Sequence, residues 1–318
     1  MRTLAHPRLL ARRSVRALLG QWPLAMADEV EGIHQARVAS RRLRELVPAL
    51  AHAGDAREAR RLRRDLRMVT RLLGPSRELD VALLTLRAVE ARRPGLESAV
   101  AAVQAHIARK RAEAGRLAHA RAESVDVEGL ADGVGALGAR HGTPAAARGC
   151  ARRVAARLGR RAGELQKSVV DAGLMFAPGP LHAVRIAVKK FRYALEAAER
   201  LGQFRLAGSM RRLKDLQRLL GDLHDLQVLA GIVRDVGAQA TGALRRQLEA
   251  LVETLDHEIR ALHGRFVSER DLIVVLLTRA SDVRRALVAM PPPGAPVFPA
   301  RRARQAGFPT QAPRRRRR

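Results

Sequence analysis

The chain has 318 residues, of which 47% are hydrophobic and only 3% aromatic, with a formal net charge of +29. This apolar content excludes wholesale disorder and is enough for a sizeable buried core. The single cysteine, Cys150, excludes an intramolecular disulfide framework and a zinc site built on several thiolates. Abundant Ala, Leu, Arg and Glu, with few aromatic or β-branched runs, favour an all-α fold.

The positive charge is spread over the body of the chain and is not confined to its end. Residues 289–318 carry eight arginines and no acid, which leaves +21 of the net charge on the other residues. A folded body this basic repels itself, and therefore indicates a polyanionic partner.

Targeting signals are not recognisable. No run of about 18 apolar residues is present, which predicts that nothing spans a membrane. Arginines interrupt Met1–Gly20, so this segment lacks the apolar core of a secretory signal. We therefore expect a soluble cytoplasmic protein that makes no membrane contact.

Glycine and proline divide the chain into predicted helices. We expect helices at about 33–50, 56–73, 76–91 and 96–122, with breaks at Gly74–Ser76 and Arg93–Gly95. The glycine-containing stretch 125–144 is expected to be a connector. Pro178–Pro180 leads into a further helix, and the Pro-, Gly- and Arg-rich residues from Pro291 onward are expected to be disordered.

The chain contains an internal repeat. Ile33–Arg44 recurs as Leu181–Arg192 at an offset of 148 residues, and Arg71–Val81 recurs as Arg218–Val228 at an offset of 147. Two matched blocks in the same order predict two homologous helical halves, 1–145 and 146–288, within one domain of 1–288, followed by a disordered tail of 289–318.

Each repeat helix presents one basic face and one apolar face when it is wound at about 3.6 residues per turn. The basic face carries His34, Arg37, Arg41 and Arg44 in the first copy and His182, Arg185, Lys189 and Arg192 in the second; the apolar face carries Ala36, Ala39, Leu43, Leu46, Val47 and Leu50, and then Val184, Ala187, Phe191, Ala194 and Leu195. The following helix adds Arg60, Arg64, Arg67 and Arg71, and its counterpart adds Arg211, Lys214 and Arg218.

These rows favour a binding function over a solvated surface. Like charges at i, i+4 destabilise an isolated helix by roughly 0.2–0.5 kcal/mol per pair, and only Glu45 interrupts the first row. The alternative is a solvated helix face, which is the usual meaning of a charge run but normally mixes signs. His34 and His182 could likewise be surface or core residues, although matched positions at the head of both rows favour binding. A polyanion would favour the cationic form of each imidazole.

At these residues the chain resembles the CHAD family, the histidine-centred α-helical domain. The resemblance rests on His34–Arg44 and Leu181–Tyr193 and covers about 6–288. It implies two four-helix bundles related by a pseudo-twofold axis, with a basic central pore that binds inorganic polyphosphate without catalysis. It also implies association with polyphosphate granules and no cofactor.

The binding residues that the resemblance implies come from both repeat helices and from the helix after each. They are His34, Arg37, Arg41, Arg42 and Arg44, with Arg64, Arg67 and Arg71, and then His182, Arg185, Lys189, Lys190 and Arg192, with Arg211, Lys214 and Arg218. Family members often have an Arg-Asp pair after the Leu-Gly turn, whereas this chain has Arg77-Glu78 and His224-Asp225.

Two other functions stay open at this level. The first is nonspecific binding of DNA or RNA, helped by the Arg314–Arg318 run, although the basic rows hold no aromatic platform for bases apart from the adjacent Tyr193. The second is a phosphotransferase or polyphosphate hydrolase. Paired carboxylates for Mg²⁺ and a Gly-rich phosphate loop are absent from the repeat helices, which disfavours an enzyme.

Overall fold

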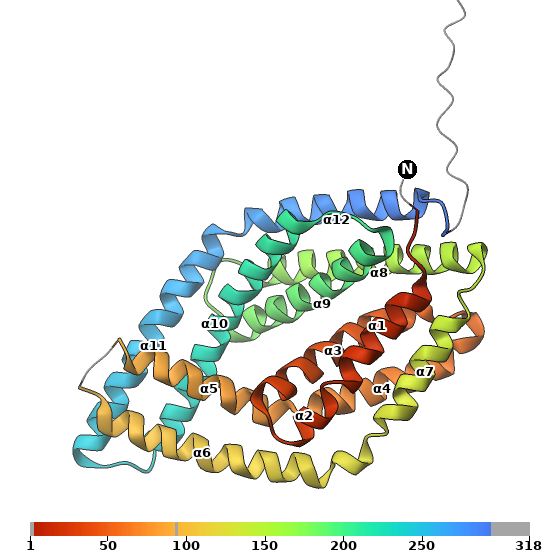
Figure 1. The fold of residues 1–318 in the computed structure, drawn as a ribbon. Coiled ribbons are helices and arrows are strands. Elements are labelled where there is room, and N and C mark those ends of the chain that lie inside the picture. The colour runs from red at the N-terminus through yellow and green to blue at the C-terminus, as the bar shows by residue number, and fades with distance from the viewer. Residues whose placement is uncertain (1–2, 93–94, 294–318) are drawn as a thin grey trace, which may run out of the picture.

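The computed structural model describes residues 3–92 and 95–293, and these residues form an all-α fold without strands (Figure 1). The predicted fold class is confirmed. In chain order the helices are α1 (Pro7–Leu19), α2 (Trp22–Met26), α3 (Val30–Leu50), α4 (Ala56–Leu72), α5 (Gly74–Glu90), α6 (Glu97–Ala120), α7 (Val127–Ala139), α8 (Pro144–Ala172), α9 (Pro178–Gly202), α10 (Ala207–Gly237), α11 (Gly242–Ser268) and α12 (Asp271–Ala289), with short 3-10 turns at Ala53–Asp55 and Ala122–Ser124.

The helices pack in three groups. One comprises α1, α3, α4 and α7, and a second comprises α8, α9, α12 and the first part of α10. The third joins α5 and α6 to α11 and the last part of α10, so it draws on both halves of the sequence (Figure 1). The pseudo-twofold relation between two bundles stays a prediction.

The predicted apolar faces of the repeat helices form the core. All eleven residues of the two predicted apolar faces are buried. They lie in a continuous cluster that includes α1, α4, α8 and α12. Burial of these faces orients α3 and α9, so that their basic faces turn away from the core.

The predicted break after the second helix is present in the first half alone. The chain ends α4 at Leu72 and begins α5 at Gly74, with Pro75 in its first turn. In the second half α10 runs without interruption through Gly221 and Asp222. The difference follows from Pro75, whose ring lacks an N–H and clashes with the preceding turn, whereas Asp222 continues the helix.

The expected connector at 125–144 is wrong in part, because this stretch contains helix α7. The Asp126 carboxylate caps the helix by accepting a hydrogen bond from the Gly129 amide at 2.7 Å. A Cβ at Gly138 would lie 2.6 Å from the Ala11 Cβ, so glycine permits close packing of α7 on α1. Close packing of this kind offsets the low helix propensity that suggested a connector.

Two further expectations concern the ends of the fold. No helix among residues 3–92 and 95–293 is long and apolar enough to cross a membrane. The sequence predicts a tail from residue 289, but α12 extends to Ala289 and the Leu4 amide donates to the Pro291 carbonyl oxygen at 3.1 Å. Residues 294–318, including the Arg314–Arg318 run, lie outside the described residues.

Candidate anion-binding site

The basic faces of α3 and α9 turn toward one cavity of about 630 Å³. The first half of α5 and the middle of α10 supply the rest of its lining. Its charged and polar lining residues are His34, Arg37 and Arg41 from α3, Arg77 and Glu78 from α5, Arg185, Lys189, Arg192 and Tyr193 from α9, and Lys214, Gln217, Arg218, Asp222, His224 and Asp225 from α10. The repeat therefore brings two cationic rows, far apart in sequence, to the same space.

Arg37 is held in place by the end of α4. Its Nη1 donates to the Thr70 carbonyl oxygen at 2.5 Å, and the Ser40 and Thr70 hydroxyls lie 3.0 Å apart beside it. Burial, together with the charges of Arg41 and Arg77, lowers the pKa of Arg37 to about 10. The guanidinium is thus partly desolvated and surrounded by like charge, and a bound anion would relieve both effects.

Lys189 on α9 is the most perturbed cation of the cavity. Burial, together with the charges of Arg185 and Arg41, lowers its pKa to about 7. In the empty cavity this ammonium group therefore exchanges its proton near neutral pH. An anion beside it would stabilise the charged form and raise the pKa.

Histidines lie along both sides of the cavity. Burial is the main reason that the pKa of His34 and of His182 falls below the ordinary value. Burial and the charge of Arg185 lower the pKa of His224 to about 4. The Nδ1 atoms of His182 and His224 lie 3.4 Å apart. His182 is thereby positioned on the cavity side of α9, although it is not among the lining residues.

Carboxylates also face the cavity. Glu78, Asp222 and Asp225 line it, and Arg185 Nη2 lies 3.5 Å from Asp225 Oδ1. Burial raises the pKa of both aspartates. The second basic row has no acid in its own sequence, but α10 supplies one. The signal was present in the repeat, since Glu78 and Asp225 occupy matched positions.

The predicted site residues separate into two sets. Those that line the cavity are His34, Arg37, Arg41, Arg185, Lys189, Arg192, Lys214 and Arg218, while Arg42, Arg44, Arg64, Arg67, Arg71, His182, Lys190 and Arg211 do not. Arg42, outside the cavity, and Arg192, which lines it, both pair with Glu196, through Arg42 Nε at 3.0 Å and Arg192 Nη1 at 2.6 Å. This carboxylate neutralises part of the charge that the sequence pattern assigned to ligand binding.

The helix break explains why matched residues differ in position. Lys214 and Arg218 lie on the uninterrupted α10 and line the cavity. Their counterparts, Arg67 and Arg71, lie on α4, which ends before the turn into α5. The change of direction at Pro75 therefore separates the basic row of α4 from the cavity.

Sequence reasoning missed Arg77, Gln217 and His224 as lining residues. Arg77 is close enough to lower the pKa of both His34 and Arg37. The repeat offers a signal for Arg77 and His224, because they stand at matched positions directly before Glu78 and Asp225.

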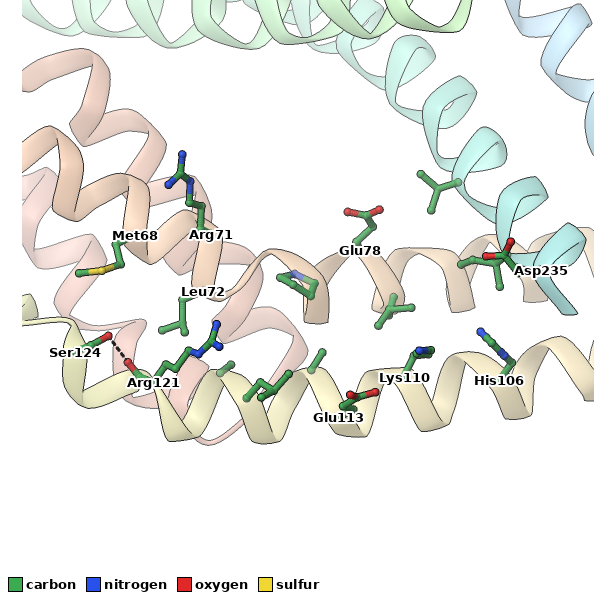
Figure 2. A pocket seen from close by; sticks show the side chains of 17 residues that line it. Met68, Arg71, Leu72, Glu78, His106, Lys110, Glu113, Arg121, Ser124 and Asp235 are labelled. Atoms are coloured by element: carbon green, nitrogen blue, oxygen red, sulfur yellow. Dashed lines mark hydrogen bonds between the residues drawn. The ribbon is translucent and has the colours of Figure 1, made fainter.

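A neighbouring cavity of about 690 Å³ lies between α4, α5, α6 and α10. Figure 2 shows Arg71 and Glu78 at its upper side, with Lys110 and Glu113 on α6 and Arg121 just after α6 below. Much of its lining is apolar, and its charged residues have mixed signs. It shares Glu78 with the first cavity, but its chemistry suits a polyanion less well.

A family model and one solved structure point to the same family. The family model described as "CHAD domain" matches residues 9–234 of this chain. Among solved structures the chain is similar to PptA from Streptomyces chartreusis, with 19% identity, a TM-score of 0.60, and coverage of 85% of this chain and 100% of that chain. It is also similar to the crystal structure of the CHAD domain from the plant Ricinus communis, with 20% identity, a TM-score of 0.50, and coverage of 91% and 93%. At these identities the structural likeness concerns the fold. No curated protein matches the chain.

Proposed function

The chain belongs to the CHAD domain family, and from this premise we propose that it binds inorganic polyphosphate, without catalysis, in the cavity between α3 and α9. The observation that carries the proposal is the convergence of both repeat-helix basic rows on that cavity. Cytoplasmic location and association with polyphosphate granules follow from the same proposal.

The chemistry of the lining residues supports a phosphate chain as the ligand. Arginine forks bind phosphate oxygens bidentately, and lysine adds a point charge. Arg37, Arg41, Arg185 and Lys189 supply both kinds of group. Burial and mutual repulsion destabilise the charged forms of these side chains. A chain of negative charges would neutralise several of them at once, and this favours its binding.

Nonspecific nucleic-acid binding is the second candidate. The exposed arginines Arg64 and Arg211 would suit the phosphate backbone of a nucleic-acid duplex. The cavity between α3 and α9, at about 630 Å³, is too small to admit a duplex. Single-stranded nucleic acid usually needs stacking platforms. The one aromatic side chain in the cavity, Tyr193, is 5% exposed and has the Arg192 guanidinium 4.5 Å from its ring centroid. The cavity therefore favours a ligand without bases.

Titration with labelled long-chain polyphosphate at two salt concentrations tests the proposal. Both the full chain and a chain ending at residue 293 are used, and excess duplex DNA is added as a competitor. We expect both chains to bind polyphosphate and DNA not to displace it. Equal displacement by DNA, with an affinity that falls steeply with salt, would favour the nucleic-acid function. Phosphate release in the same samples would contradict a purely binding role.

The perturbed lysine predicts a pH dependence of binding. Lys189 has a pKa of about 7 in the empty cavity, and the bound polyanion raises it. Binding then takes up a proton above pH 7, so affinity is constant just below that pH and falls as pH rises, by at most about tenfold per unit. Lys189→Met should bind more weakly and lose this dependence, as measured by titration with long-chain polyphosphate between pH 7 and 9.

The same substitution should stabilise the empty protein. Because folding lowers the Lys189 pKa, the charged lysine opposes folding below its ordinary pKa of about 10.4, and the effect is largest below pH 7. The melting temperature of Lys189→Met should therefore exceed that of the unchanged protein most at acidic pH.

Lys214→Met, at an exposed lining position, is the control for the binding measurement. It should weaken polyphosphate binding without changing the pH dependence of the affinity. If the binding affinity of Lys189→Met fell with pH as it does in the unchanged protein, Lys189 would not be the group that takes up the proton.

A further inference from the structure

The two matched arginines of the central cavity are held by different means. Arg37 Nη1 donates to the main-chain carbonyl oxygen of Thr70 at 2.5 Å. Arg185 Nη2 instead lies 3.5 Å from the Asp225 carboxylate, and its buried Nε atom has no hydrogen-bond partner among the described residues. A carbonyl oxygen orients a guanidinium group without cancelling its charge, whereas a carboxylate cancels part of that charge. The repeat therefore supplies two arginines at matched positions that are not equivalent as binding groups.

The helix break beside Pro75 explains the difference. Thr70 lies within the last four residues of α4, which ends at Leu72, and the carbonyl groups of such residues have no partner within their own helix. The Thr70 carbonyl oxygen is therefore available to accept from Arg37. In the second half the matched residue, Gln217, lies inside the uninterrupted α10, where carbonyl oxygens accept from amides one turn further along.

Two hydroxyl groups join the end of α4 to α3. The Ser40 hydroxyl reaches the Arg37 carbonyl oxygen at 2.9 Å, the Thr70 hydroxyl reaches the Leu66 carbonyl oxygen at 3.0 Å, and the two hydroxyl oxygens lie 3.0 Å apart. Each hydroxyl has one hydrogen to donate and also accepts, so the pair links the two helices beside Arg37. The second half has Val188 in place of Ser40 and cannot form this link.

Gly74 leaves the space in which the Arg37 guanidinium group lies. A Cβ at position 74 would lie 3.2 Å from Arg37 Nη1, which is closer than the optimal separation of about 3.5–4.0 Å between non-bonded carbon atoms. The guanidinium group would therefore have to move away from the Thr70 carbonyl oxygen. The φ angle of Gly74 is not positive, so alanine fits the backbone at this position.

We propose that Ser40, Thr70 and Gly74 are positioning residues, which hold Arg37 as a pre-organised anchor for the phosphate chain. The proposal rests on the proposed function, since Arg37 acts on the ligand in the same cavity. Arginine normally loses side-chain freedom when it binds, and a guanidinium group that is already fixed loses less. The contact with Thr70 uses one N–H group of Arg37 and leaves the other donors for phosphate oxygens.

The first test is Gly74→Ala in the full chain, titrated with labelled long-chain polyphosphate. Moving Arg37 without removing its charge should weaken binding about three- to tenfold, which is less than the effect of losing a whole charge-assisted hydrogen bond. The melting temperature should not fall, because alanine favours a helix more than glycine does. Gly163→Ala is the matched control and should keep the affinity, since a Cβ at this exposed position of α8 would meet nothing within 4 Å.

Repeating the substitution in an Arg37→Gln background separates positioning from a general structural effect. A positioning residue acts through the side chain that it holds, so Gly74→Ala should then change the affinity less than about twofold. Thr70→Val should likewise weaken polyphosphate binding only while Arg37 is present. Thr70→Ser, which keeps the hydroxyl group, should restore the affinity.

The outcomes distinguish the positioning role from the proposed function. A loss of affinity on Gly74→Ala that is equal with and without the Arg37 side chain would overturn the positioning role, and so would unchanged affinity of Gly74→Ala or of Arg37→Gln. Failure of the unchanged protein to bind polyphosphate would instead overturn the proposed function. Helical circular dichroism and melting temperature establish that the variants are folded.

Discussion

Replacing Arg37 and Arg185 together by glutamate is expected to abolish tight polyphosphate binding while leaving the helical signal intact. The two residues stand at matched positions of the repeat and both line the cavity. Loss of one charge-assisted hydrogen bond at each position removes about 1.5–3 kcal/mol, which for two corresponds to about 10²–10⁴-fold in affinity. The new carboxylates add repulsion, so the loss should lie at the upper end. Titration with labelled polyphosphate measures it.

The matched control reverses the same amount of charge elsewhere. Arg12→Glu with Arg16→Glu places the change on exposed positions of α1, where it should weaken binding only through the general field of the protein and disappear at high salt. If a folded Arg37→Glu/Arg185→Glu variant kept the affinity of this control, the cavity would not be the binding site. Circular dichroism and thermal melting separate loss of binding from loss of structure.

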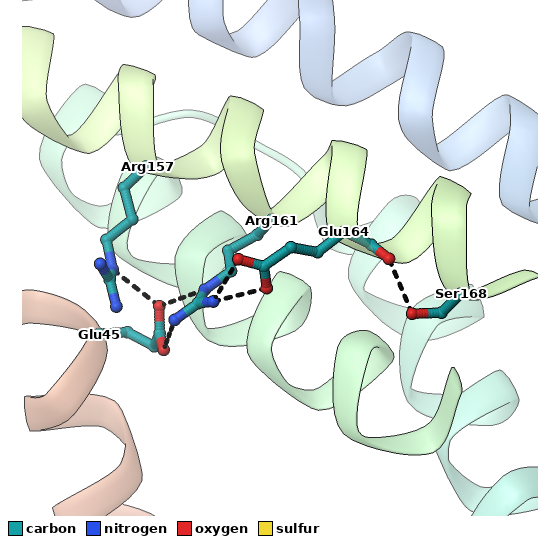
Figure 3. Close-up of polar contacts among 5 residues, drawn as sticks. All are labelled: Glu45, Arg157, Arg161, Glu164 and Ser168. Carbon is teal, nitrogen blue, oxygen red and sulfur yellow. Dashed lines mark hydrogen bonds and ion pairs between the residues drawn. The ribbon is translucent and has the colours of Figure 1, made fainter. Parts of the chain in front are cut away.

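Removing the Glu45 carboxylate should strongly destabilise the protein. Both Arg157 and Arg161 depend on it, and their side chains are only 9% and 11% exposed (Figure 3). Glu45→Gln would leave a buried guanidinium group without a counter-charge, which typically costs about 3–5 kcal/mol of unfolding free energy. Denaturant unfolding at neutral pH measures the change.

Glu164 provides the matched comparison, because it pairs with the same arginine from an exposed position. Arg161 Nη1 donates to Glu164 at 2.8 and 2.6 Å, and the Glu164 side chain is 45% exposed. Glu164→Gln should lower the unfolding free energy by less than about 1 kcal/mol. Equal effects of the two substitutions would contradict the role assigned to burial.

The Glu45 pair also predicts an acid sensitivity. Burial raises the pKa of Glu45, but hydrogen bonds and charges from Arg161 and Arg157 outweigh it and lower the pKa below its ordinary value. The contribution to stability is therefore present above the unfolded-state pKa and is lost as pH falls through the folded-state value. Glu45→Gln should remove this part of the acid dependence.

The amino-acid sequence by itself determined the fold class, the family and the positions of α3, α4, α5, α6 and α9. Helix periodicity is local, so the apolar faces of α3 and α9 could be read from spacing, and all their predicted residues are buried. Pro75 likewise fixed a helix boundary, because a missing N–H acts within one turn. The glycine-containing α7 escaped prediction, since its stability comes from packing against α1 and not from propensity.

The tertiary structure decided which cations share a space. Arg37 and Arg185 come together because two apolar faces are buried in one core. The break at Pro75 turns Arg67 away from that space, and the residues that pair with Arg42 and Arg157 lie 154 and 112 positions away in sequence. Charge interactions depend on distance in space and on burial, neither of which a sequence pattern contains. The sequence therefore identifies the basic rows, while packing sorts them into cavity, ion pairs and surface.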